Sequence, residues 1–214
     1  MKGLLVKDWE LMKQQKKFFL MLAVIAILFY LSGSTGFAMG YFTVLSAFFT
    51  VTTISYDEYD NGYAFLMTLP MIRRDYAKEK YCLGILLTLT GWCAAMLLGL
   101  FGKGIGKESS TLEELLISGG MIIAIAVGML AVILPMTVRY GAEKGRYIAI
   151  GFWGAAFAMI YGAAQLKVFS IKNAEHFFHE IPVAVLLLFV GLAAIGVYYI
   201  SYRICVGMME KKEF

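Results

Sequence analysis

The chain has 214 residues, of which 60% are hydrophobic and 16% are charged, with a formal net charge of +4 at pH 7. Soluble domains are charged at roughly one residue in four, so this composition excludes an ordinary soluble globular protein. It also argues against nucleic-acid binding, which requires a basic stripe with aromatic or groove-reading residues on a soluble surface.

Six apolar stretches run through the chain, each of about 20 residues, which is the length needed to cross a bilayer core of roughly 30 Å. Backbone groups in lipid must be paired internally, which leaves helices or closed barrels, and the alternation typical of barrel strands is absent. We therefore predict an all-α integral membrane protein with a single transmembrane domain over residues 1–214. The predicted spans are 18–35, 37–56, 81–101, 115–138, 147–166 and 181–203.

Residues 1–17 precede the first span and carry five lysines. A basic amphipathic helix that contains a tryptophan lies in the headgroup plane of a membrane. We expect such an N-terminal interfacial helix, which either anchors the chain or adds to a cytoplasmic docking surface. In helical projection its apolar side consists of Leu4, Leu5, Trp9, Leu11 and Met12.

The second span carries hydroxyl groups at spacings of three, four and three residues, which place them on one helical face. Such groups either bond to a neighbouring helix or line a substrate path, and both alternatives stay open. The residues are Thr43, Ser46, Thr50 and Thr53. The apolar interiors of the six spans hold no Asp, Glu, Lys or His, so no proton relay, catalytic residue or metal site is predicted there.

The segment 57–80 separates the second and third spans and is the main polar part of the chain. Three acidic residues, Asp57, Glu58 and Asp60, are expected near a helix start, where the helix dipole favours them. Pro70 should end a short helix just before it, and a basic helix should lead into the third span. Aromatic and apolar side chains beside charges mark interaction sites; here they are Tyr59, Tyr63, Phe65, Leu66, Met67 and Leu69. The alternative is a re-entrant turn packed on its own protein.

The fifth span carries a stripe of small residues at spacings of four, three and four. Small residues allow two helix backbones to approach closely, either within one subunit or across a dimer. The stripe consists of Gly151, Ala155, Ala158 and Gly162. The glycine-rich sequence at 101–108 lacks the Gly-Lys-Ser/Thr of a phosphate loop, so ATP hydrolysis is not expected on this chain.

Charge predicts the orientation in the membrane. Short cytoplasmic loops are enriched in Lys and Arg. Placing the amino terminus in the cytoplasm leaves only four of the 19 basic residues outside, namely Lys103, Lys107, Lys167 and Lys172. We therefore expect both termini on the cytoplasmic side of the membrane, which the resemblance described next implies is a bacterial cell membrane.

Several short motifs resemble those of the type-2 ABC transporter permeases. They are Lys7-Asp8, Asp57-Glu58-Tyr59, Thr68-Leu69-Pro70, Arg73-Arg74-Asp75-Tyr76 and Lys80-Tyr81. The resemblance is to the small six-helix bacterial subfamily that includes the permeases of exporters for phenol-soluble modulins. It covers the whole chain in layout, and its specific motif lies within about residues 56–81.

The resemblance implies that 57–80 is a cytoplasmic coupling segment, whose helix docks on a separate ATPase, and that two permeases pair with two ATPases. ATP and Mg²⁺ are then expected on the partner chain, with no cofactor on this one. Gly62 and Tyr63 stand where the family has a Trp and an acid. The coupling residues it implies, together with the apolar side chains between them, are Asp57, Glu58, Tyr59, Asn61, Tyr63, Phe65, Leu66, Thr68, Leu69, Pro70 and Arg73.

The resulting hypothesis is a permease subunit of an ATP-driven exporter that works as a homodimer. The favoured substrate is an amphipathic peptide, with a lipid or hydrophobic compound as the alternative, because the spans carry no fixed charge that would select an ion. A stand-alone secondary carrier and a non-transporting membrane scaffold or immunity protein are the competing hypotheses.

Overall fold

The computed structural model describes residues 2–59, 73–104, 111–165 and 183–211. This part of the chain contains helices and no strand, which confirms the predicted all-α class. The helices are α1 (Lys2–Gln14), α2 (Lys16–Leu31), α3 (Thr35–Glu58), α5 (Arg73–Gly104), α6 (Leu112–Tyr140), α7 (Ala142–Gln165) and α9 (Val183–Lys211).

Four helices of the described part, α3, α5, α6 and α9, are long and apolar enough to cross a membrane. Helices α1 and α2 are bent by 64° relative to each other and together would make a fifth span. The first predicted span was expected to reach residue 35, but α2 ends at Leu31 because the chain turns at Gly33, which has a positive φ of 82°. The predicted six spans therefore stay a prediction, with α2 and α7 as the remaining two.

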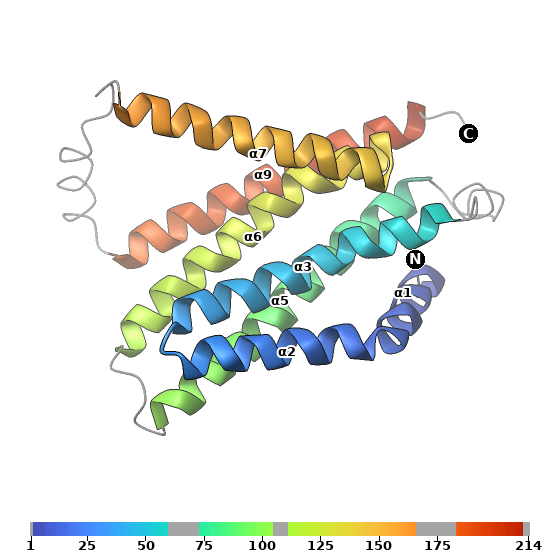
Figure 1. Cartoon of the computed structure of the whole chain (residues 1–214). Helices are drawn as coiled ribbons and strands as arrows, with labels where there is room; N and C mark the ends of the chain where they lie inside the picture. The colour runs from blue at the N-terminus through green and yellow to red at the C-terminus, as the bar shows by residue number, and fades with distance from the viewer. Residues whose placement is uncertain (1, 60–72, 105–110, 166–182, 212–214) are drawn as a thin grey trace.

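The helices form a bundle in which α3, α5 and α6 are central (Figure 1). Helix α3 packs against both α5 and α6, α9 packs against α6 and α5, and α2 packs against α3. Helix α7 lies along one side of the bundle against α6 and α3. The N-terminal helix α1 and the C-terminal end of α9 lie at the same end of the bundle (Figure 1), which agrees with an even number of spans.

Hydrogen bonds between α5, α6 and α9 fix the centre of the bundle. The Tyr198 hydroxyl donates to the Tyr81 carbonyl at 2.9 Å, and the hydroxyls of Tyr81 and Ser201 lie 2.6 Å apart. Ser201 also donates to the carbonyl of Ala131 on α6. Polar side chains buried in an apolar bundle need such partners, so these bonds set how the three helices face each other.

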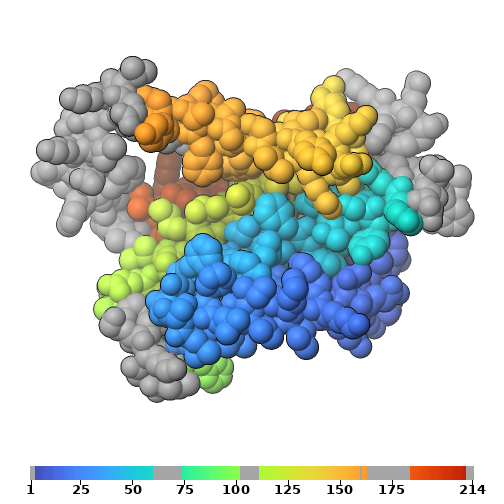
Figure 2. All heavy atoms as spheres, viewed as in Figure 1, coloured from blue at the N-terminus to red at the C-terminus, as the bar shows by residue number. Residues whose placement is uncertain are grey.

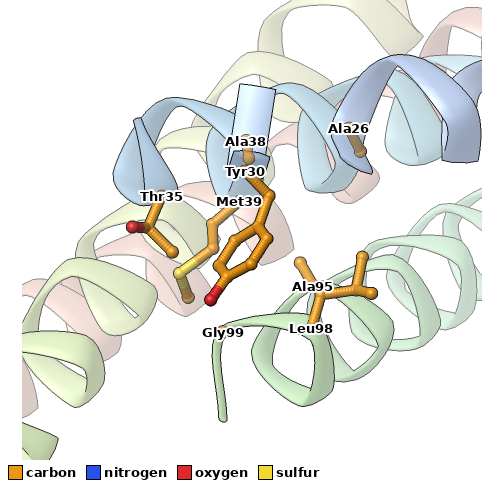
Figure 3. Close-up of a pocket in the computed structure, with 8 residues that line it drawn as sticks. All are labelled: Ala26, Tyr30, Thr35, Ala38, Met39, Ala95, Leu98 and Gly99. Atoms are coloured by element: carbon orange, nitrogen blue, oxygen red, sulfur yellow. The ribbon is translucent and has the colours of Figure 1, made fainter. Parts of the chain in front are cut away.

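The end of the bundle far from α1 is closely packed. Tyr30 reaches from α2 toward Gly99 of α5, beside Met39 of α3 (Figure 3). The cavity that these side chains line has a volume of about 10 Å³. A single water needs roughly that much space, so this cavity is too small for a substrate.

Helices α3 and α5 approach each other closely where Gly91 faces Ser46. A β-carbon built on Gly91 would lie 2.6 Å from the Ser46 β-carbon. The absence of a side chain at Gly91 therefore lets the two backbones pack together, as small residues do in membrane helix pairs.

We expect Gly91→Ala to lower stability by about 1–3 kcal/mol, the usual cost of overpacking. The double variant Gly91→Ala/Ser46→Gly should recover most of this loss, because the clashing atoms are removed. Gly128→Ala is the control: its β-carbon meets nothing within 4 Å, so its higher helix propensity should leave stability unchanged or slightly raised. Thermal unfolding in detergent checks the series, and equal effects of Gly91→Ala and Gly128→Ala would contradict the close packing.

Candidate functional site

Asp57 and Glu58 lie in the last turn of α3, whereas they were expected near a helix start. Negative charges at a helix C-terminus oppose the helix dipole, so other groups must compensate for them. Both carboxylates are in fact bound by groups from other helices, and this compensation lets α3 continue two residues past the expected end at residue 56.

Lys80 of α5 is the centre of this arrangement, and its side chain is 0% exposed. Its ammonium group lies 2.6 Å from Asp8 Oδ2, 2.8 Å from Asp57 Oδ2 and 3.0 Å from Thr53 Oγ1. An ammonium group has three N–H donors, and here each has an acceptor. A buried charge is costly unless it is paired and hydrogen-bonded, and Lys80 meets both conditions.

Lys7 and Tyr76 complete what we call the ion cluster, defined as Lys7, Asp8, Asp57, Tyr76 and Lys80. The Lys7 ammonium donates to Asp57 Oδ1 and lies 3.2 Å from Asp8 Oδ1. The hydroxyl of Tyr76, which is fully buried, donates to Asp57 Oδ2 at 3.0 Å. Two ammonium groups thus face two carboxylates, with the carboxyl group of Glu79 3.7 Å from Lys80.

The ion cluster determines which face of α1 is buried. Burial alone would raise the pKa of Asp8, but the ammonium groups of Lys80 and Lys7 hold the pKa below its usual value. Asp8 is therefore a buried carboxylate, and it lies with Leu4 on the side of α1 that packs inward. Trp9, which lies on the predicted apolar side of α1, is exposed on the surface of the bundle, so the expected contact of this side with the membrane stays a prediction.

Glu58 connects the same end of α3 to α7. The backbone N–H of Ala142, the first residue of α7, donates to Glu58 Oε2 at 2.6 Å. A carboxylate at a helix N-terminus is stabilised by the free N–H groups and by the helix dipole. The turn before it needs glycine, because Gly141 has a φ of 89°. Adjacent carboxylates of α3 therefore hold α1 and α5 through Asp57, and α7 through Glu58.

The hydroxyl stripe of α3 faces α5. All four of its residues, Thr43, Ser46, Thr50 and Thr53, are buried. Ser46 meets Gly91, the Thr50 hydroxyl lies close to Gly84, and Thr53 accepts a hydrogen bond from Lys80. A hydrogen bond to a neighbouring helix is present at Thr53, whereas the hydroxyls of Thr43 and Thr50 have no partner in the described part of the chain. Both alternatives for the stripe, bonding to a neighbouring helix and lining a substrate path, therefore stay predictions.

Most of the predicted coupling residues lie outside the described part of the chain: Asn61, Tyr63, Phe65, Leu66, Thr68, Leu69 and Pro70. Tyr59 is 74% exposed at the end of α3, and Arg73 is the first residue of α5. Asp57 is 5% exposed and Glu58 is bound to α7, so both support the ends of the coupling segment from within the chain. The contacts of the segment with an ATPase stay a prediction.

The small-residue stripe of α7 lies on its outer side. Gly151, Ala155 and Ala158 are exposed, and a β-carbon built on Gly151 or Gly162 would meet nothing within 4 Å. Figure 2 shows α7 along one edge of the molecule. No helix of the described part covers this stripe, so any packing role it has requires a partner outside the chain.

The pairing of Asp8 and Asp57 with Lys80 was not foreseen from the sequence. Lys80 reads as one of several basic residues that set the orientation, and its neighbours in the cluster lie 23 and 72 residues away in sequence. The position of Lys80 could have indicated this pairing. Lys80 lies directly before the apolar run of the third span, where a lysine is costly unless it is paired.

Comparison with protein families identifies a match over nearly the whole chain. The model of a family described as "ABC-2 family transporter protein" matches residues 3–210. Comparison with curated proteins and with solved structures gave no match.

A double-mutant cycle tests the ion cluster. Asp8→Asn and Lys80→Met should each lower stability by about 3–5 kcal/mol, because each leaves an unbalanced buried charge. The double variant should lose clearly less than the sum, since Lys7 and Asp57 remain as a balanced pair. Glu10→Gln, which removes an exposed ion pair with Lys13, is the control and should change stability by about 0–1 kcal/mol. Chemical unfolding in detergent gives the values, and strictly additive losses would show that Asp8 and Lys80 do not interact.

Proposed function

The chain belongs to the ABC-2 family of transporter proteins, and on that premise we propose that it is the transmembrane permease subunit of an ATP-driven exporter. The family implies a multi-pass membrane protein with ABC ATPase partners. The proposed substrate is an amphipathic peptide, a lipid or a hydrophobic compound, which is moved out of the cytoplasm. The ATPase subunits, two in the full assembly, bind ATP and Mg²⁺ and supply the energy.

One observation carries the mechanism: the two helices that flank residues 60–72 are joined by the ion cluster. Helix α3 enters this segment and α5 leaves it. The ion pair between Asp57 and Lys80 links them at that point, at 2.8 Å. A push on the coupling segment would therefore act on α3 and α5 together and would not simply separate them.

The same connection extends to α1 and α7. Asp8 and Lys7 bring α1 into the cluster, and Glu58 holds the first residue of α7. In the proposed cycle, ATP binding closes the two ATPases, the coupling segment of each permease is displaced, and the joined helices tilt together. Rigid-body motion of packed helices is a common form of such transitions.

Two further features support the proposed assembly and its location. The uncovered small-residue stripe of α7 offers a close helix contact for a second copy, which would make a homodimer around a shared pathway. Most of the basic residues lie in α1, near the start of α5, at the junction of α6 and α7 and at the end of α9. These helix ends lie at the same end of the bundle (Figure 1), which supports cytoplasmic termini in a bacterial cell membrane by the positive-inside rule.

The proposal is tested by co-purifying the chain in detergent with a soluble ABC ATPase encoded in the same genome and measuring ATP hydrolysis with and without the permease. We expect a stable complex with altered hydrolysis. Phe65→Asp/Leu69→Asp should abolish this effect while leaving the permease folded, because charged residues replace the predicted docking surface. Lys107→Asp, on the predicted outer side, is the control and should behave as the unmodified chain.

Other outcomes would point to the competing functions. Substrate movement that persists in vesicles without any ATPase would indicate a secondary carrier. A stable complex in which neither hydrolysis nor substrate movement changes would indicate a scaffold or immunity protein.

Cysteine cross-linking tests the homodimer. Ala158→Cys, placed on α7 in a Cys82→Ala/Cys93→Ala background, should give a cross-linked dimer in membranes under mild oxidation, because symmetric packing of α7 brings the two sulfurs together. The unmodified chain is a matched control, since Cys93 is exposed on α5, away from the proposed contact. A dimer formed equally well through Cys93, or none through position 158, would place the interface elsewhere.

A further inference from the structure

A groove runs between α3, α6 and α7, with a volume of about 480 Å³. Ligand sites of proteins are typically about 300–1,000 Å³ and mostly apolar, with a few polar groups that fix orientation. The walls of this groove are apolar or aromatic and come from all three helices: Leu45, Phe48, Met129, Ile133, Ile150 and Trp153. Ile150 is 68% exposed, so the groove is open toward the surface of the bundle.

Among the described residues that line this groove, Arg146 is the only charged one. Its guanidinium group donates one hydrogen bond, to Ser55 Oγ at 2.6 Å. No carboxylate among the described residues forms an ion pair with it, and the nearby Glu58 is bound to the N–H of Ala142. Arginine presents five donors that suit carboxylates and phosphates, so most of its binding capacity is free for an anion.

Trp153 lines the groove on the same helix as Arg146. It lies seven residues after Arg146 on α7, or about 10 Å further along the helix axis. Its indole N–H is buried and has no acceptor within the described part of the chain. The groove thus combines a cation at the end of the bundle that carries the termini with an aromatic, apolar interior. This arrangement is complementary to an amphiphile whose anionic group lies at the membrane surface and whose hydrocarbon chain lies inside the groove.

The lining of the groove favours a hydrocarbon chain over an extended peptide. An extended peptide would bring backbone N–H and C=O groups that apolar walls cannot pair, whereas an acyl chain has no polar group along its length. The open side of the groove between α3 and α7 would let such a chain enter from the bilayer.

We propose that this groove binds one acyl chain of an anionic phospholipid, with the phosphate of the headgroup at the Arg146 guanidinium and the chain extending past Trp153. The inference rests on the proposed permease function and narrows its substrate class to anionic lipid amphiphiles. The lipid enters from the leaflet on the side of the termini, where Arg146 lies.

Quenching of Trp153 fluorescence tests this proposal. The full chain with Trp9→Phe and Trp92→Phe, in which Trp153 is the remaining tryptophan, is reconstituted in phosphatidylcholine vesicles. Dibrominated phosphatidylglycerol or dibrominated phosphatidylcholine with identical chains is then added at the same low mole fraction. We expect the anionic lipid to quench with about fivefold higher affinity, the contribution of one basic residue near an anionic headgroup.

Matched variants identify the cause of that preference. Arg146→Gln should abolish it, Arg146→Lys should keep much of it because the charge remains, and Arg139→Gln, another exposed arginine at this end of the bundle, should leave it unchanged. Elution as a single folded species is checked for each variant, and Arg146→Ala takes the place of Arg146→Gln if that variant does not fold.

Three results would overturn the proposal. They are equal quenching by the two lipids in the unmodified groove, an unchanged preference in Arg146→Gln, and protection of Trp153 from both lipids by an uncharged amphipathic peptide, which would assign the groove to peptide. Because this measurement needs no ATPase, its failure would leave the permease assignment to be decided by the hydrolysis experiment alone.

Discussion

The buried ammonium group of Lys80 is the interaction on which the arrangement of this bundle depends. Lys80 sits at the start of an apolar helix, where an unpaired charge would be strongly unfavourable, and it is compensated by Asp8 of α1 and Asp57 of α3. These pairings fix the rotation of α1, the length of α3 and the relative position of α3 and α5. Replacement of such a cluster by apolar residues often costs little stability. We therefore infer that the cluster mainly specifies how the helices are arranged and adds less to the free energy of unfolding.

The position of the ion cluster would allow it to transmit force from residues 60–72 to the helices. It lies where α3 leads into residues 60–72 and α5 leads out of them, and the neighbouring Glu58 holds the start of α7. A force applied to that segment would meet four helices joined by charged groups. Packed elements of this kind move between discrete arrangements as bodies, which is what transmission from a soluble motor to a membrane pathway requires.

Helix α7 differs from the rest of the bundle in having little of its surface covered. It is held at its first residue by Glu58 and along one side by α6 and α3, while its small-residue stripe and much of its aromatic surface are exposed. Its inner side contributes Arg146 and Trp153 to the groove. Helix α7 therefore borders both the proposed subunit contact and the proposed lipid site.

The sequence by itself determined the all-α membrane class, the approximate extent of the helices and the family resemblance, because apolar run length, glycine turns and short motifs are local properties of the chain. It placed Asp57 and Glu58 near the start of a helix, whereas they form the last turn of α3. The tertiary structure decided that Asp8 and Lys80 are partners, that the hydroxyl stripe faces α5, and that Arg146 lies at the end of an apolar groove. Each of these depends on the rotation of helices distant in sequence, which is set by the balance of buried charge and close packing across the whole bundle.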